Sequence, residues 1–501
     1  MKKITCLLSA CLLLLVLASC SEFSTTYYLD AANGNDNQSG LSESNAWKSL
    51  SKLRDVKLNP GDRVLLKRGN TFQGELEISG QGTSDNRIYI EAYGEGDKPC
   101  IVGNDTSLYA VRILNSDYLT LRNVEIVNTG KERKPHRTGL KIECRNYGVS
   151  KNIVIDGVDI RDVNGSLVKE EGGGSGILIV NGGKDVISVF DSLTIENCRI
   201  WRCARNAMIW SGYSSRENWH PSKHTVIRKN LIEEVPGDGI VPIGCDSTLI
   251  EYNVMRNCPA TLPDTEAAAG IWPWSCDNTV IQFNEVSDHK APWDAQGFDS
   301  DWNCRNTLIQ YNYSHDNDGG MVLICNSGES PASFNAGNVG TVVQYNISIN
   351  DGRRTRPTRV GMFSPLIHLA GPVKNTTIYR NIIHAGMKYI EEMDCSMMTF
   401  DSWGGYPDST FVHENIFQSF EKSTFNFTKS TNNVFVHNYY VGRFTQKPDD
   451  RLPQSFPDEY SIPEMLEMVE IAGTYGRFVK STAIRKFFEQ SYYKKVKCGK
   501  K

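Results

Sequence analysis

The sequence lacks the cysteine spacings that build metal sites and disulfide frameworks. Three of its fourteen cysteines lie within the first twenty residues, and the other eleven are scattered singly, without any CxxC pair. A zinc site or a compact disulfide framework is therefore not indicated. Cys198 and Cys203 are close enough in sequence to pair, but buried thiols that act as small apolar side chains are the alternative interpretation.

Excess charge and long apolar runs are also missing. The net charge is −4 and the pI is about 6.2, and no broad basic region is present to hold phosphates. Nucleic acid is therefore excluded as an expected partner. Beyond the first twenty residues no long apolar run follows, so the rest of the chain is expected to be water-soluble.

Residues 1–20 have the order of a secretory leader. Lys2 and Lys3 precede an apolar run that ends in the small residues of "LASC". This ending resembles the bacterial lipobox, in which the cysteine, here Cys20, is lipidated and becomes the mature N-terminus. An ordinary signal peptide with a chance cysteine is the alternative. The resemblance implies a cell-envelope protein, on the periplasmic or the surface side, whose only membrane contact is its lipid anchor.

A repeated segment of alternating apolar residues, usually interrupted by an asparagine, runs through most of the chain. Examples are "LTIENCRI" at 193–200, "TVIQFNEV" at 279–286 and "TVVQYNIS" at 341–348. The pattern predicts a coil of strands with one turn per repeat, because asparagine tolerates the left-handed backbone of a sharp corner and its amide can bond the equivalent group in the next turn. The expected corner residues are Asn123, Gly157, Asn197, Asn230, Asn253, Asn284, Asn312, Asn346, Asn381, Asn415 and Asn438.

A second set of short apolar strands lies between these repeats and often begins with glycine. It includes "GIWPW" at 270–274, "GFDSDW" at 297–302 and "GMVLIC" at 320–325. Two strand sets in one register indicate an all-β fold, a single parallel β-solenoid over residues 21–445, rather than several domains. Residues 446–501 read as helices that cap or pack against the far end. A monomer is expected.

These asparagine-punctuated turns resemble the right-handed parallel β-helix of the pectin-lyase-like superfamily. The stretch "LNPGDRVLLKRGNTF" is similar to the first coil of many secreted bacterial members. The resemblance implies a short helix at about Ala46 to Val56 that caps the open end of the solenoid. It is specific for the fold only, since such folds host hydrolases, lyases, esterases and binding proteins. The motifs NTD, GHG and RIK of the polygalacturonases are absent, so no residue role is transferred from them.

The stretch "GFDSDW" carries two carboxylates on one strand. Side chains alternate along a strand, so Asp299 and Asp301 are expected on the outer face, with Trp272 and Trp274 one turn earlier and Val322 and Ile324 one turn later. Like charges at this spacing raise one pKa, which provides a proton donor beside an ionised base or nucleophile, as glycoside hydrolysis requires. Neighbouring turns add Asp238 and Asp318 as further catalytic candidates.

Two other interpretations of these aspartates remain open. They can be solvated on an exposed face, or they can bind calcium together with Asp294, Asp316 or Asp318, because carboxylates on adjacent turns form oxygen cages. No cofactor is required by the hydrolytic interpretation, and calcium is the one metal that the pattern allows.

Aromatic and basic residues suggest a sugar-binding surface around the same strands. Flat rings suit the C–H faces of sugars, and arginine forks bind carboxylates such as those of uronates. A solvated charge run is the alternative for the arginines, and a structural role is the alternative for each histidine. The candidate binding residues are Trp272, Trp274, Trp293, Trp302, Trp403, His289, Lys290, His315, Arg353, Arg354 and Arg356.

Three functional classes follow. The favoured one is a glycoside hydrolase that acts on a plant or algal polysaccharide, acidic or pectin-like, or on its oligosaccharides. The second is a polysaccharide lyase that uses Lys290 or a loop arginine as base, with calcium. The third is a lipoprotein that binds glycans without catalysis or removes ester decorations.

Overall fold

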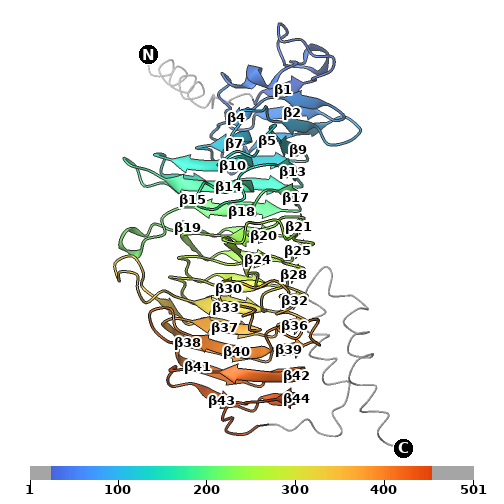
Figure 1. Cartoon of the computed structure of the whole chain (residues 1–501). Coiled ribbons are helices and arrows are strands. Elements are labelled where there is room, and N and C mark those ends of the chain that lie inside the picture. The colour runs from blue at the N-terminus through green and yellow to red at the C-terminus, as the bar shows by residue number, and fades with distance from the viewer. Residues whose placement is uncertain (1–23, 454–501) are drawn as a thin grey trace, which may run out of the picture.

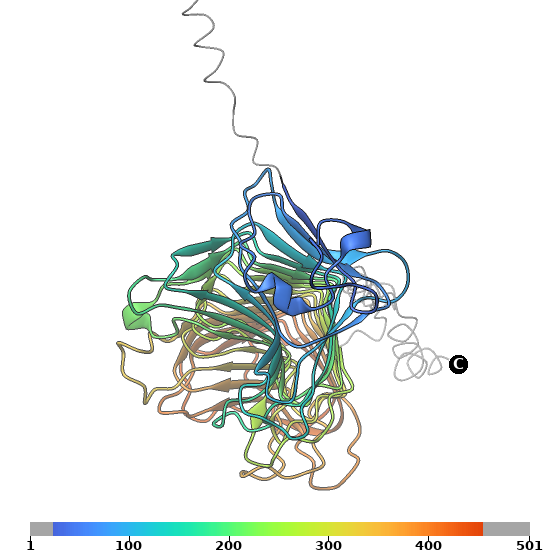
Figure 2. The same ribbon diagram turned by 90° about the horizontal axis from the view of Figure 1, so that it is seen from above.

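The computed structural model describes residues 24–453, and they form a right-handed parallel β-helix, as expected. The coils are stacked along one axis from β1 to β44 (Figure 1) and superimpose when viewed along that axis (Figure 2). The leader with Cys20 lies outside the described residues, and so does the segment expected to be helical, 446–501, from residue 454 onward. Within 24–453 no helix is long and apolar enough to cross a membrane.

Three long parallel sheets form the walls of the solenoid. The first sheet contains β1 (Thr26–Leu29), β2 (Arg63–Lys67), β5 (Ile88–Tyr93), β8 (Leu119–Arg122), β12 (Val154–Asp156), β16 (Thr194–Glu196), β20 (Val226–Arg228), β24 (Leu249–Glu251), β27 (Val280–Gln282), β31 (Leu308–Gln310), β35 (Val342–Gln344), β38 (Val373–Tyr379), β41 (Asp408–His413) and β43 (Val434–Val436), with β34 (Asn338–Val339) beside β38. The second contains β3 (Thr71–Gln73), β6 (Cys100–Val102), β9 (Glu125–Asn128), β13 (Asp159–Val163), β17 (Arg199–Cys203), β21 (Leu231–Glu233), β25 (Val254–Arg256), β28 (Glu285–Ser287), β32 (Tyr313–His315), β36 (Ile347–Ile349), β39 (Ile382–Ala385), β42 (Ile416–Asn426) and β44 (Tyr439–Phe444).

The third sheet carries the acidic pair. Its first part contains β4 (Leu76–Ile78), β7 (Tyr109–Leu114), β10 (Thr138–Arg145), β14 (Ser175–Gly182), β18 (Asn206–Ser211) and β22 (Ile240–Val241), and its second part contains β30 (Phe298–Ser300), β33 (Val322–Cys325), β37 (Ile367–Ala370) and β40 (Ser396–Asp401). Single bridges from Ile271 to Ile240 and Phe298 join the two parts. Smaller sheets contain β11 (Val149–Lys151), β15 (Val189–Asp191), β19 (Ser222–Lys223) and β23 (Cys245–Asp246), and β26 (Ala267–Ala268) with β29 (Trp293–Asp294).

The interior is one continuous apolar core made of stacked equivalent residues. In the first sheet Ile195, Ile227, Ile250 and Ile281 pair in register on successive strands, and all are fully buried. Burial of each such side chain contributes about 2 kcal/mol. All ten cysteines of the described part of the chain are free, so Cys198 and Cys203 do not pair. Trp210 is buried in the core at 2 % exposure.

The expected asparagine ladder exists, but its residues differ in part from those predicted. From Asn230 to Asn438 each buried side-chain amide donates to the side-chain oxygen of the next asparagine, as Asn312 Nδ2 does to Asn346 Oδ1 at 3.0 Å, and Asp450 accepts the last of these bonds. The left-handed corner is the residue before the ladder position, for example Phe283 with φ 58°. In the first coils Asn123, Gly157 and Asn197 stand at that corner, next to buried Val124, Val158 and Cys198.

The N-terminal cap also differs from the prediction. Two 3₁₀ turns, η1 (Glu43–Asn45) and η2 (Leu50–Leu53), replace the helix expected at Ala46 to Val56, while η3 (Arg216–Asn218) lies in a later loop. Asp36 holds the backbone and hydroxyl of Ser49, which fixes the chain in an extended form before η2. Leu50 and Leu53 still reach the core, so the apolar cover of the first coil is present.

Replacement of Asn312 with Ala is expected to destabilise the protein by about 3 kcal/mol, because buried partners on both neighbouring coils lose their hydrogen bonds. Chemical denaturation measures this loss. The control is Asn197→Gly, at an exposed left-handed corner with φ 55°, where glycine fits the backbone and the change should be small. Equal destabilisation by the two variants would show that the ladder is not the stabilising element.

Candidate active site

Asp299 and Asp301 lie on the outer face of the third sheet, as predicted. Phe298 points into the core, and the Ser300 hydroxyl bonds Thr341 and Asn338 inside the coil. The following strand is displaced by one residue from the expected register, because Phe298 pairs with Val322 rather than Met321. The outer neighbours of the two aspartates are therefore Leu323 and Cys325, and not Val322 and Ile324, which lie in the core.

A loop brings a third acidic residue to this pair. Asp294 ends β29, and both Asp294 and Ala295 adopt left-handed backbone conformations, with φ of 59° and 60°. Arg354 holds this turn from a loop two coils further along the chain. Its guanidinium donates to the carbonyl oxygens of Ala291 (3.1 Å), Pro292 (2.6 Å) and Asp294 (3.0 Å). The arginine is thus a buried clamp for the turn that presents Asp294.

The three carboxyls have unequal electrostatic environments. Burial, followed by the charge of Asp301, raises the pKa of Asp294 to about 6. Burial and the neighbouring acids raise the pKa of Asp299 well above its usual value, and its buried Oδ1 has no hydrogen-bond partner among the described residues. Burial also raises the pKa of Asp301, but the Trp302 N–H (2.6 Å) and the Cys325 thiol (3.0 Å) both donate to its Oδ1 and favour the ionised form. In a cluster of three carboxyls with unequal environments, one carboxyl can be protonated while another is ionised.

A pocket of about 220 Å³ opens beside Asp294, whereas Asp299 and Asp301 are not among its lining residues. Asp294 lines it together with the rings of Trp293, Phe363 and Trp403 and with His368 and Asp401. His368 pairs with Leu323, and Leu323 with Asp299, so His368 stands two coils beyond the acid on the same ladder. No lysine or arginine side chain lines this pocket.

The tryptophans divide between the pocket and its surroundings. Trp302 and Trp403 pack on the outer cluster of Leu323, Cys325 and Ala370, and Trp293 lines the pocket with Arg359 4.0 Å from its ring centroid. Trp272 is the neighbour of Asp299 in the preceding coil, since the Asp299 N–H donates to the carbonyl of Ile271, and it is 8 % exposed. The ring centroid of Trp274 lies 6.5 Å from that of Phe334.

The carboxylate of Asp238 lies against Trp272 and accepts hydrogen bonds from several donors. Arg205 forms an ion pair with it, and the indole N–H of Trp272 and the backbone N–H of Ala269 donate to its Oδ1 at 3.1 Å each. The residue is 1 % exposed. These contacts give Asp238 the role of a support for Trp272, out of reach of a sugar.

The other candidates at the adjoining corner are engaged in bonds within the protein. Lys290 Nζ donates to the Asp316 carbonyl at 2.8 Å and lies 3.2 Å from Asp318 Oδ1. His289 is fully buried, which lowers the pKa of its ring, and its Nε2 lies 2.9 Å from the Gly237 carbonyl. Both side chains are therefore bound within the protein in this structure.

The remaining candidates lie away from the pocket or bind backbone. His315 is on the second sheet, between Asp316 and Glu285, and these carboxylates raise the pKa of its ring to about 9 against the effect of burial. Arg353 stacks on Tyr389 with its guanidinium 3.5 Å from the ring centroid, and Arg356 donates to the Lys290 carbonyl. Arg353, Arg354 and Arg356 are thus bound within the protein, whereas Arg359 of the same loop is exposed and stacks on Trp293 at the pocket.

Sequence reasoning did not single out Asp294, His368 or the clamping role of Arg354. Asp294 was considered only as a calcium ligand, because it lies outside the repeat and its orientation depends on a left-handed turn. Among residues 24–453 no group of three or more histidines, cysteines, aspartates or glutamates is arranged to hold a metal ion.

Comparisons with known proteins agree with this fold. The family described as "Right handed beta helix region" matches residues 175–355. A lacto-N-biosidase of Bifidobacterium longum subsp. longum is 28 % identical over 459 residues, which cover 72 % of this chain. The chain spans only 28 % of the length of that relative.

Two solved structures extend the comparison. The GH136 lacto-N-biosidase from Eubacterium ramulus has a TM-score of 0.59 at 22 % identity, over 86 % of this chain and 68 % of its own. A mannuronic acid specific polysaccharide family 6 lyase from human gut microbiota has a TM-score of 0.51 at 14 % identity, over 86 % of this chain and 93 % of its own. At these identities the likeness concerns the fold.

Proposed function

We propose that this protein is a glycoside hydrolase whose proton donor is Asp294 and whose ionised base or nucleophile is Asp301. The observation that carries the proposal is the unequal pair: Asp294 lines the pocket with a pKa of about 6, whereas Asp301 receives two hydrogen bonds on one carboxylate oxygen. Cleavage of a glycosidic bond needs one acid for the leaving oxygen and one carboxylate for the anomeric carbon or its attacking water.

Asp299 has a supporting role in this proposal. Its carboxyl is buried, and burial together with the charges of Asp294 and Asp301 raises its pKa, which favours the protonated form. A neutral carboxyl can donate a hydrogen bond to a sugar hydroxyl and adds no further negative charge to the site.

The expected substrate is an uncharged sugar chain. The pocket combines acids with aromatic rings, and no lysine or arginine is among its lining residues, which favours a substrate without negative charge, although Arg359 stacks on the lining residue Trp293. The acidic, pectin-like substrate expected from the sequence stays a prediction, and the glycan panel below tests it against a neutral one. The similarity to a lacto-N-biosidase supports an oligosaccharide of the kind that enzyme cleaves as the first substrate to test.

A glycan panel tests the proposed function. The panel contains lacto-N-biosidase substrates, other neutral oligosaccharides, and pectic and algal polysaccharides. Formation of new reducing ends without the ultraviolet absorbance of unsaturated uronates supports hydrolysis. Appearance of that absorbance would identify a lyase, and retention on a glycan column without any product would identify a binding protein.

The rate should depend on pH as a bell-shaped curve. Asp294 must be protonated to act, so kcat/KM is expected to fall as the pH rises through about 6. Asp301 must be ionised, so activity is also expected to fall in acid, at a pH above the ordinary aspartate pKa, because burial raises its pKa. Initial rates across the pH range, with stability measured in parallel, check both limbs. A profile that rises through pH 6 would contradict the assignment of Asp294.

We further propose that no metal takes part in the reaction. Prolonged dialysis against EDTA is expected to leave kcat and KM unchanged, since Asp294 and Asp301 carry both proton-transfer roles. The rate is compared before dialysis, after dialysis and after calcium is restored. Loss of activity that calcium restores would favour the calcium interpretation of the aspartates.

We also propose that Cys20 is lipidated and attaches the protein to the cell envelope as a monomer. Support comes from the order of charged, apolar and small residues in 1–20. Metabolic labelling with a fatty acid, compared between the native chain and Cys20→Ser, tests the anchor.

A further inference from the structure

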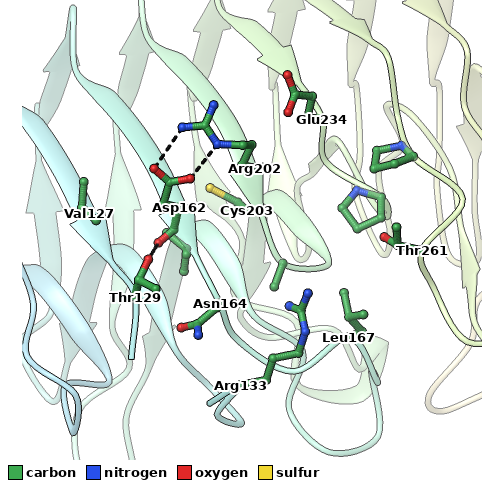
Figure 3. Close-up of a pocket in the computed structure, with 14 residues that line it drawn as sticks. Val127, Thr129, Arg133, Asp162, Asn164, Leu167, Arg202, Cys203, Glu234 and Thr261 are labelled. Carbon is green, nitrogen blue, oxygen red and sulfur yellow. Dashed lines mark hydrogen bonds and ion pairs between the residues drawn. The ribbon is translucent and has the colours of Figure 1, made fainter. Parts of the chain in front are cut away.

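A second hollow of about 580 Å³ lies at the corner between the second and third sheets, in coils that precede the acids (Figure 3). We call it the upstream groove. It is lined by Arg133, Asp162, Leu167, Arg202, Glu234 and Thr261, among others. In Figure 3 the Asp162–Arg202 pair and Glu234 lie on one side, and Arg133 and Leu167 lie on the other. Its volume falls in the usual range for small-molecule sites.

The wall of the groove is a ladder of polar corner residues. Asp162, Arg202 and Glu234 occupy equivalent positions on three successive coils, and all three have left-handed backbones with φ of 52°, 50° and 55°. Glycine or asparagine would adopt this conformation at lower energy. Long charged side chains at such corners project outward from the coil, toward any ligand that follows the axis.

The chemistry of the groove suits hydroxyl groups. Arg202 binds Asp162 through both nitrogens of a fork, at 2.6 and 3.0 Å, so these charges largely cancel. Glu234 and Thr261 are exposed, and no hydrogen bond within the described part of the chain occupies their side chains. Arg133 and Glu234 carry opposite charges on opposite sides of the groove, and Val127, Leu167 and Ala204 provide apolar surface. Sugar units offer this combination of hydroxyls and C–H faces without net charge.

One loop connects the upstream groove with the acids. Leu167 lines the groove and packs against the cluster of Leu262, Ala268, Ala291 and Ala295. Two residues later, Lys169 places its Nζ 5.8 Å from the ring centroid of Trp272, which pairs beside Asp299. Ala268 pairs with Asp294 itself. The groove and the acids are thus joined by one loop, and Thr261 of the groove lies in the coil that precedes the coil of Asp294.

We propose that the upstream groove binds additional neutral sugar units of the glycan that is cleaved at Asp294 and Asp301. This inference rests on the proposed function and extends it to the length of the substrate. Chains that reach from the pocket into the groove bind more tightly than fragments that fill the pocket alone.

The test fills the groove without touching the acids. Thr261→Trp occupies the groove from an exposed loop, and Glu234→Gln removes its free carboxylate. Glu414→Gln is the control, because Glu414 is a half-buried glutamate at a left-handed corner, with φ 54°, where it pairs with Arg380 outside the groove. The probes are the longest and the shortest oligosaccharides that the native protein cleaves in the glycan panel.

For the long probe, Thr261→Trp is expected to raise KM about fivefold or more, and Glu234→Gln to raise it less, with kcat little changed. For the short probe both variants and the control should match the native protein. Equal effects on long and short probes, or none on either, would overturn the proposal.

Failure of the hydrolase proposal gives a different result. If the native protein cleaves nothing, chito-, xylo- and galacto-oligosaccharides are titrated into it by calorimetry. Binding that Thr261→Trp abolishes and Glu414→Gln retains supports a glycan-binding groove without hydrolysis. Binding unaffected by Thr261→Trp, or no binding by any of the three series, overturns the groove.

Discussion

Asp301→Asn is expected to lower kcat on the cleaved glycan about 10³-fold or more, with the fold intact, because the amide cannot act as base or nucleophile. Asp294→Asn should lower it by a similar factor, since the leaving oxygen then departs without a proton. Asp299→Asn should cost about tenfold or less, because asparagine resembles the protonated carboxyl that the buried site favours. Steady-state kinetics measures all three variants.

Two comparisons separate the roles of these acids. Asp294→Asn should retain much of its rate on aryl glycosides whose leaving group needs no proton, whereas Asp301→Asn should be inactive on both substrate types. Asp185→Asn, at an exposed position remote from the strands that carry the acids, is the matched control and should behave as the native protein does. Full activity of both Asp294→Asn and Asp301→Asn would remove these residues from the mechanism.

Arg354→Ala is expected to lower kcat about 10²-fold, although Arg354 itself does not contact substrate. Its guanidinium holds three carbonyl oxygens of the turn that presents Asp294, and that turn carries two consecutive left-handed residues. Gly319 also supports the turn, since a Cβ there would lie 2.2 Å from the Asp294 carbonyl oxygen. Loss of the clamp lets the carboxyl leave its productive position, and a small displacement of an acid is costly to the rate.

Several readouts distinguish this positioning role from general instability. The basic limb of the pH profile should shift in Arg354→Ala, because Asp294 moves to a different environment, and added guanidinium should restore part of kcat. Arg353→Ala, which removes a neighbouring buried arginine that stacks on Tyr389, is the control. Unchanged kcat in Arg354→Ala, or a loss that only tracks unfolding, would contradict the clamp.

The fold could be predicted because its signal is repeated. Each coil carries the same alternation of apolar residues, so single irregular coils did not obscure the register of the first sheet. The exact corner residue could not be predicted, since an asparagine next to a corner and an asparagine at it look alike in sequence. Asn197 and Asn230 illustrate the difference: the first has φ 55° and faces solvent, and the second is buried in the ladder.

The site could be predicted only where strand geometry determines it. Alternation placed Asp299 and Asp301 outward, but it gave no information on loops that cross from other coils. Asp294 and Arg354 lie on such loops. Arg354 donates its hydrogen bonds to backbone carbonyls, and a contact of this kind leaves no pattern in the sequence. The arginine-rich segment looked like a free anion-binding surface, whereas Arg354 is buried at 2 % exposure.

Digestion of the cleaved glycan in water labelled with heavy oxygen examines most directly whether this outer-face pocket performs hydrolysis. The native protein should place one labelled oxygen on the anomeric carbon of the new reducing end, detected by mass spectrometry after rapid derivatisation, and Asp301→Asn should yield no labelled product in the same time. An unsaturated product without the label, or equal labelling by the native protein and Asp301→Asn, would contradict the account.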